Sequence, residues 1–315
     1  MADNTQTRPA STAAAGTAAG TAAAATPAPV APTRRRPRLP KLANLGTILA
    51  LAWTAVILLG ALVVDFLPVS ESRDPSQALM TPSNLAPDLF TEHPLGTDGQ
   101  GLDILGGLLY GARVSLVVGI GGVLIGALIG GALGLVAGYR GGWTDRIVSI
   151  FTDTLLAFPS LILLIAIVTA LNPTLPNVTF ALGVMVVPSF ARLVRANAMS
   201  YANREFVTAA RSLGAGEFRI MFREVAPNIV QSVFAYSFML IAVLIVAEAS
   251  LSYLGLSIPR PEPTWGNMIS AGQSDFNRYP YLVGIPAVVL FLTVLSFNQI
   301  GEAAGRKWSP GAAKI

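Results

Sequence analysis

The sequence contains no cysteine and only one histidine, His93, among its 315 residues. Disulfide bonds and thiolate metal sites are therefore excluded, and so are sites built from several histidines. His93 precedes a proline in a turn-rich stretch, where we expect a structural role. No lysine follows a glycine, so the chain has no G-K-[ST] phosphate-binding loop. No Ser/His pair can be placed across the hydrophobic runs, and we expect no catalytic residue and no metal.

Charged residues are also scarce, at 12%, whereas a soluble domain carries about 25%. Hydrophobic residues make up 53% of the chain, and the mean hydropathy is +0.60. The apolar residues fall in runs long enough to span a bilayer as helices, which takes about 20 residues. We therefore expect an all-α membrane protein in a lipid bilayer. The net charge of +4 does not indicate a nucleic-acid partner, because the basic residues cluster between the hydrophobic runs.

Six hydrophobic runs predict six transmembrane helices within a membrane domain over residues 38–308. The predicted spans are 46–67, 114–138, 147–170, 177–198, 229–254 and 281–301. Residues 1–37 are rich in Ala, Thr and Pro and end in basic residues, and this composition predicts a disordered tail. Residues 309–315 form a short C-terminal tail.

The distribution of basic residues predicts the orientation. With the N-terminus inside, 17 of the 21 Lys and Arg residues fall in inner segments. The remaining four, Arg73, Arg113, Arg260 and Arg278, fall in outer segments. Because cytoplasmic loops carry the excess of basic residues, we expect both termini to be cytoplasmic. An odd number of spans would break this asymmetry.

Glycines recur every fourth residue in the second span. They are Gly122, Gly126, Gly130, Gly134 and Gly138. Helical residues four apart share a face, and small residues let helix backbones approach closely in lipid. The ladder predicts packing against another helix, and a role in lining a pathway or a moving interface is the alternative.

Three prolines, Pro159, Pro188 and Pro286, lie inside predicted spans and favour kinks.

Two acidic residues, Asp153 and Glu248, lie furthest inside hydrophobic runs. A charge at mid-bilayer costs about 2.5–3.5 kcal/mol on insertion scales, but both residues lie within two turns of a span end. We favour structural hydrogen bonds or ion pairs, with Arg146 and Arg192 as candidate partners of Asp153. A direct transport role is the alternative.

The inner loop at 199–228 is the most informative segment. Its composition predicts a short helix over 206–213 that breaks at Gly214 and Gly216. Leu213 and two small alanines form a compact, shallow knob flanked by basic residues. Such a knob is suited to docking into a cleft on another protein, although a plain surface loop is the alternative. The residues concerned are Arg204, Ala209, Ala210, Arg211 and Leu213.

The spacing of Ala209-Ala210, Gly214 and Pro227 resembles the "EAA" loop of ATP-binding-cassette (ABC) importer permeases, E-A-A-x3-G-x9-I-x-L-P. Thr208 stands where that pattern has Glu, Glu224 where it has Ile and Ala226 where it has Leu. The resemblance implies a coupling helix that docks into an ATPase subunit. The implied coupling residues are Arg204, Thr208, Ala209, Ala210, Arg211, Leu213, Gly214 and Pro227.

Further blocks resemble the peptide branch of that family, the DppC/OppC-like permeases, over about 38–308. The stretch HPLGTD at 93–98 is followed by GAR at 111–113, although Leu102 replaces the branch's usual Arg. The other blocks are AGYRGGWTDR at 137–146, DTLLAFPSL at 153–161, AEASLSYLGLSIPRPEPTWGNMIS at 247–270 and FLTVLSFNQIGEA at 291–303.

The resemblance implies a type I ABC-importer permease fold in the bacterial inner membrane. It also implies four partner subunits: a homologous DppB/OppB-like permease, two ATPase subunits that carry ATP and Mg²⁺, and an extracytoplasmic peptide-binding protein. The implied cargo is a di- or oligopeptide, while the same branch includes importers of glutathione and nickel complexes. A secondary transporter is the alternative outside the family, but the sequence lacks the two-half repeat of many such folds.

Overall fold

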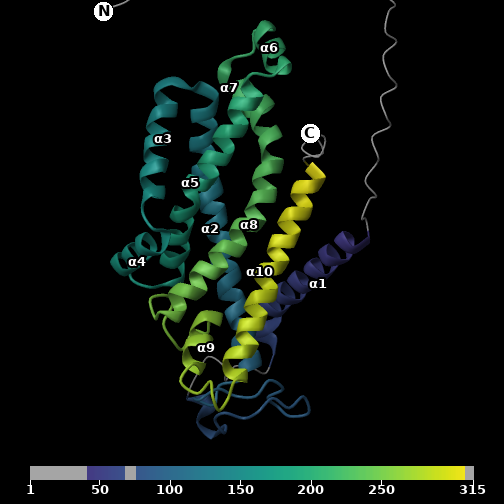
Figure 1. Ribbon diagram of the computed structural model, residues 1–315, viewed down its shortest axis with the longest axis vertical. Coiled ribbons are helices and arrows are strands. Elements are labelled where there is room, and N and C mark those ends of the chain that lie inside the picture. Colours follow the sequence, from purple (N-terminus) through teal and green to yellow (C-terminus); the bar gives the residue numbers. More distant parts are fainter. Residues whose placement is uncertain (1–40, 68–75, 309–315) are drawn as a thin grey trace, which may run out of the picture. The chain divides into compact units, whose positions relative to one another are not determined.

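The computed structural model describes residues 41–67 and 76–308, and these are mostly helical (Figure 1). The only extended pairing among the described residues is an isolated bridge between Thr97 and Asp103. The predicted tails, 1–37 and 309–315, lie outside the described residues. The described chain is therefore an all-α protein.

Five helices among the described residues are long and apolar enough to cross a membrane. They are α1 (Lys41–Val63), α2 (Ile104–Arg140), α5 (Leu175–Ala202), α8 (Ala226–Tyr253) and α10 (Tyr281–Trp308). A short 3-10 turn, η1 (Val64–Phe66), extends α1, and α8 continues directly from α7 (Glu217–Arg219) and a π-helical turn, η4 (Ile220–Val225).

The predicted span at 147–170 is not one straight helix. It consists of α3 (Gly142–Ala157) and α4 (Ser160–Leu171), which meet at an angle of 92°. The break has a local cause, because the residue before a proline is pushed out of the helical region. Phe158, directly before Pro159, has φ −81° and ψ 137°. Counted as one broken span, the pair brings the total to six, the predicted number.

Helix α2 begins earlier than the predicted 114–138 span. The Asp103 side chain accepts a hydrogen bond of 3.0 Å from Gly106 N, so the helix starts at Ile104. Arg113 therefore lies within α2 and not in an outer loop. Its Nη2 lies 2.6 Å from Asp65 Oδ2, which ties α2 to η1. Hydropathy alone placed the start too late because the first turns of α2 mix glycines with apolar residues.

The three prolines differ in their effect. Pro159 separates two helices, whereas Pro188 and Pro286 lie inside α5 and α10, which continue through them. The predicted kink is confirmed at Pro159, where the bend is sharp enough to separate two helices, while the kinks at Pro188 and Pro286 stay predictions.

Helices α2 and α5 pack closely over residues 122–138 of α2 because the glycine ladder faces α5. A methyl group built at Gly130, Gly134 or Gly138 would lie closer than 3.0 Å to backbone carbonyl oxygens of α5. At Gly122 and Gly126 it would approach Leu244 and Val186 side chains, with backbone atoms of α5 just beyond. The absence of side chains thus sets the separation of the two helices.

Short elements cap the ends of the long helices. Figure 1 shows α6 (Glu205–Ser212) beyond the ends of α5 and α8, and α9 (Trp265–Gly272) near the opposite end of α8. A capping box between Thr264 and Asn267 starts α9. The fully buried Trp265 donates from Nε1 to Leu108 O at 3.0 Å, which anchors α9 to α2.

The buried apolar residues of the described chain form two clusters. The larger one joins α1, α2, α4, α5, α8, α9 and α10. The smaller one lies where α2, α5, α6, η4 and α8 meet, and is made by Leu135, Val194, Ala198, Val207, Ile220, Met221, Val225 and Ile229. This second cluster is what holds the predicted docking segment to the long helices.

Candidate functional site

The segment 203–219 folds into a helical hairpin, which we call the inner hairpin after the side of the membrane predicted for it. Asn203 ends α5, and α6 begins after Arg204, whose carbonyl accepts from Val207 N at 3.0 Å. At the tip, Gly214 has φ +80°, a conformation that glycine adopts without strain. Gly214 N donates to Arg211 O at 3.0 Å, which closes the end of α6.

Helix α6 has one buried face and one exposed face. Val207 is fully buried in the smaller apolar cluster, and Ala210 packs against that cluster. Thr208 and Ala209 are exposed, and Leu213 at the tip is 88% exposed. The short exposed side chains leave a shallow surface with one protruding leucine, the shape that a cleft on a partner protein can accept.

The structure brings together seven of the eight predicted coupling residues. They lie on α6 or directly beside it, at Arg204, Thr208, Ala209, Ala210, Arg211, Leu213 and Gly214. The eighth, Pro227, lies in the first turn of α8 and outside the hairpin. The π-helical turn η4 precedes it, with Ala226 N donating to Met221 O, so the helix continues from η4 through Pro227 into α8.

Glu217 is a hairpin residue that sequence reasoning missed. Its carboxylate accepts a hydrogen bond from the hydroxyl of Tyr139, at the end of α2. It also accepts from Arg211 Nε at 3.2 Å, within the hairpin. Tyr139 and Glu217 lie 78 positions apart, and no sequence pattern connects them.

The two carboxylates predicted inside the spans have different environments. Asp153 in α3 lies 2.7 Å from Arg192 Nη2 in α5, and both side chains are more than half exposed. Arg146, the other candidate partner, lies over the Trp143 ring at 5.8 Å. Asp153 therefore has the ion pair that we favoured, with the second of its two candidate partners.

Glu248 in α8 is completely buried. Ser257 Oγ donates to its Oε1 at 3.2 Å, while its Oε2 has no hydrogen-bond partner among the described residues. Beside it, the hydroxyls of Ser252 and Thr264 share a hydrogen bond. Glu248 thus ties α8 to the loop that follows it and does not face an open pathway in this structure.

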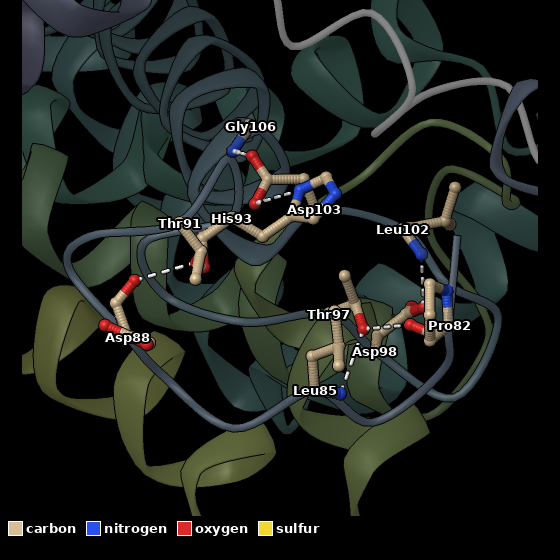
Figure 2. Close-up of polar contacts among 10 residues, drawn as sticks. All are labelled: Pro82, Leu85, Asp88, Thr91, His93, Thr97, Asp98, Leu102, Asp103 and Gly106. Carbon is tan, nitrogen blue, oxygen red and sulfur yellow. Dashed lines mark hydrogen bonds and ion pairs between the residues drawn. The ribbon is translucent and has the colours of Figure 1, made fainter. Parts of the chain in front are cut away.

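The segment 76–103, which we call the outer segment after the side of the membrane predicted for it, is organised by short polar side chains (Figure 2). Thr97 Oγ1 donates to Pro82 O at 2.7 Å and accepts from Leu85 N at 3.0 Å. Asp98 Oδ1 accepts from Leu102 N at 3.0 Å. These bonds fold the segment back on itself over the start of α2.

His93 lies against the start of α2. Its Nδ1 is 3.6 Å from Asp103 Oδ1, the oxygen of Asp103 that does not cap the helix (Figure 2). Among the described residues, no group of three or more His, Asp or Glu side chains could hold a metal ion. The contacts of His93 are those of a residue that holds the outer segment in place.

A hollow of about 280 Å³ lies between the outer segment, α9 and the start of α10. Asp98, Arg260, Met268 and Asp275 are among its lining residues. Arg260 Nη1 donates to Gln100 Oε1 at 3.1 Å and lies 3.5 Å from Asp98 Oδ2. Sequence reasoning counted Arg260 only as an outer basic residue, because its partners precede it by more than 150 positions.

Comparison with known proteins shows the family. Residues 130–300 match the family described as the binding-protein-dependent transport system inner membrane component. The glutathione transport system permease protein GsiD of Pectobacterium atrosepticum is 42% identical over 210 residues, 67% of this chain and 70% of that protein. The dipeptide transport system permease protein DppC of Alkalihalophilus pseudofirmus is 38% identical over 254 residues, 81% of this chain and 83% of that protein. The chain therefore belongs to the family of inner-membrane components of binding-protein-dependent transport systems, as a DppC/OppC-like ABC-importer permease.

Proposed function

We propose that this chain forms half of the translocation pathway of an ATP-driven importer of di- or oligopeptides, with a DppB/OppB-like permease as the other half. As an ABC-importer permease the chain is non-catalytic, and ATP is hydrolysed by partner subunits. In this proposal two ATPase subunits carry ATP and Mg²⁺, and an extracytoplasmic binding protein delivers the cargo. The observation that carries the proposal is the inner hairpin, which presents a shallow exposed surface on a buried apolar anchor.

The mechanism follows from that geometry. An ATPase that closes around ATP would displace the exposed face of α6, and Val207 would pass the displacement to the smaller apolar cluster. Packed interiors transmit strain because they have few voids. Since this cluster includes residues of α2, α5 and α8, the long helices would tilt together and open the pathway outward. Release of the hydrolysis products would reverse the change.

Gly214→Glu tests this coupling. The site has open space around it, but the φ of +80° disfavours a side chain and the new carboxylate would lie on the docking surface. We expect the variant to insert and its ATPases to hydrolyse ATP, while uptake is lost. Gly214→Asn is the matched control, because Asn tolerates this backbone conformation without adding charge. Normal uptake by the Glu variant would contradict docking at this surface.

A peptide cargo is supported by two relatives, which are named for dipeptide and for glutathione transport. Both cargoes carry peptide bonds, an amino group and carboxylates, and a nickel complex remains the alternative in the same branch. The deciding experiment is to purify the chain with its partner subunits and identify what the binding protein holds. Uptake into proteoliposomes, with dipeptide, glutathione and a nickel complex as competitors, would then rank the cargoes. Uptake without ATP would instead favour a secondary transporter.

We place the chain in the bacterial plasma membrane with both termini in the cytoplasm. The membrane location agrees with the family and with the five helices, or six spans with the bent pair, found among the described residues. The orientation is supported by the sequence count, in which 17 basic residues fall in the predicted inner segments and four in the predicted outer ones. One of these four, Arg113, lies near the start of α2. In this orientation the inner hairpin faces the cytoplasm, where ATP is available.

A further inference from the structure

Glu217, the first residue of α7, connects the inner hairpin to α2. Its Oε2 accepts from the Tyr139 hydroxyl, and its Oε1 and Oε2 accept from Arg211 Nε at 3.2 Å and Arg211 Nη2 at 3.4 Å. One carboxylate thus joins α6, α7 and α2. A second contact lies next to it, because the Arg140 guanidinium sits 5.3 Å from the centre of the Phe218 ring.

Helix α2 is not next to the hairpin in the chain, because α3, α4 and α5 lie between them. The chain connects the hairpin to α5 on one side and, through η4, to α8 on the other. Any displacement of the hairpin reaches these two helices directly, whereas it reaches α2 only through side-chain contacts. The polar contacts with the hairpin come from the last two residues of α2, Tyr139 and Arg140.

Helix α2 extends from the hairpin to the outer segment. Its 37 residues give a length of about 55 Å. At the outer end Asp103 caps the helix, and Leu108 O accepts from the buried Trp265 of α9. Between these ends the glycine ladder holds it against α5. A force applied to the inner end of α2 therefore acts on a rigid element that carries the outer segment.

We propose that Glu217 is a positioning residue that clamps the inner hairpin to α2 through Tyr139 and Arg211, so that α2 and the outer segment move with the hairpin. The inference rests on the proposed docking of an ATPase at the hairpin. Without the clamp, α2 follows the hairpin only through the smaller apolar cluster and its packing against α5, and each ATP hydrolysed produces less cargo movement. The clamp therefore sets how much uptake each ATP produces.

The clamp is expected to matter for coupling and little for folding. The side chains of Arg211 and Glu217 are 54% and 59% exposed. Exposed ion pairs of this kind contribute little to stability, because water screens them and the side chains lose freedom on pairing. Variants of Glu217 should therefore insert normally and melt at nearly the wild-type temperature, which separates a coupling defect from misfolding.

The test uses the intact importer with its partner subunits, reconstituted in proteoliposomes, with ATP hydrolysis and uptake measured on the same sample. Glu217→Ala and Tyr139→Phe are each expected to lower uptake per ATP by about 5-fold or more, the lower end of typical coupling effects. The double variant should be no worse than Glu217→Ala, because both changes remove the same contact. Arg223→Ala, an exposed change in the neighbouring η4, should keep the wild-type ratio.

A rescue experiment uses the absence of cysteine from this chain. Tyr139→Cys combined with Glu217→Cys removes the clamp and places two thiols where the side chains met. A bifunctional thiol reagent that bridges them is expected to restore uptake per ATP, and each single cysteine variant should gain nothing. The complex with the wild-type chain, treated in the same way, accounts for thiols on partner subunits.

Three results would overturn the clamp. One is an unchanged uptake per ATP in Glu217→Ala. Another is an uptake per ATP that stays low in the Tyr139→Cys, Glu217→Cys variant after the two thiols have been bridged. The third is a normal uptake per ATP in Tyr139→Phe together with a low one in Glu217→Ala. Glu217 would then act without Tyr139, as a residue of the ATPase-docking surface. The wild-type sample tests the proposed function separately, because uptake without ATP there would reject the importer proposal whatever the variants do.

Discussion

Single carboxylates of this chain hold separate elements together, and each does so through a different kind of contact. Asp103 caps α2, Asp153 pairs with an exposed arginine, Glu217 joins the hairpin to α2, and Glu248 accepts from a serine inside the protein. A carboxylate has two acceptor oxygens and can therefore bind two donors from different segments. With only 12% of residues charged, each such contact has few substitutes nearby.

Asp103→Ala should weaken the start of α2. The loss of the acceptor for Gly106 N leaves an amide of the first turn without its partner, and losing a helix cap typically costs about 1 kcal/mol. We expect a lower melting temperature for the detergent-purified chain. Asp103→Asn, which keeps a side-chain oxygen, should lie close to wild type, and equal melting of the Ala and Asn variants would argue against capping.

Glu248 variants distinguish a structural role from a transport role. Glu248→Gln keeps an oxygen that can accept from Ser257, so we expect nearly normal stability and uptake. Glu248→Ala removes that acceptor and opens a cavity in a fully buried site, with an expected cost of about 2–4 kcal/mol. The melting temperature and the uptake rate are the measurements. Loss of uptake in a stable Gln variant would instead show that transport needs the carboxyl group itself.

Among the helices, α2 and α5 form the most closely packed pair, and glycine makes that packing possible. Helix α2 offers a matched comparison of two glycines, Gly131 and Gly134. A methyl group at Gly134 would overlap backbone atoms of Ala191, whereas at Gly131 it would meet nothing within 4 Å. The two positions lie on the same helix but face different surroundings.

Gly134→Ala should therefore destabilise the chain, by about 1–3 kcal/mol for a close-packed site. Gly131→Ala should be neutral or slightly stabilising, because alanine favours helix by up to about 1 kcal/mol over glycine. Size-exclusion profiles and melting temperatures of the two purified variants check this. Equal behaviour of the two would mean that α2 and α5 do not approach as closely as described.

The bend between α3 and α4 shows how an element can depart from a hydropathy plot. The run at 147–170 is apolar on both sides of Pro159, so its composition predicts one span. The structure turns by 92° at that point. The turn separates the segment that carries Asp153 from the apolar α4, so the two halves do not form one continuous surface.

At the scale of the whole molecule, the orientation in the membrane can be tested with single cysteines. Phe90 in the outer segment is 98% exposed, and Leu213 at the hairpin tip is 88% exposed. In intact cells a membrane-impermeant thiol reagent should label Phe90→Cys. In cells that produce the chain without its ATPase partners, which would otherwise cover the hairpin tip, Leu213→Cys should be labelled only after the membrane is permeabilised. The chain itself has no cysteine and gives no background, and the reverse pattern would invert the proposed topology.

Much of this protein was predictable from local sequence. The scarcity of charge predicts a membrane protein, and the apolar runs predict six spans. A motif that spans about twenty residues predicts the position of the inner hairpin. These signals are local because a helix is specified mainly by residues within a few turns of one another. The helix predicted over 206–213 is α6, Glu205–Ser212, and its break is at Gly214 as expected.

The tertiary structure alone decided which surfaces meet. The glycine ladder indicated close packing but not its partner, α5, and the acidic residues gave no sign that Glu217 would bind Tyr139 or that Glu248 would be fully buried. In a membrane protein the lipid-facing and helix-facing sides of a span are both apolar, so hydropathy cannot tell them apart. Contacts between distant segments depend on how all the helices pack at once, and no stretch of sequence contains that information by itself.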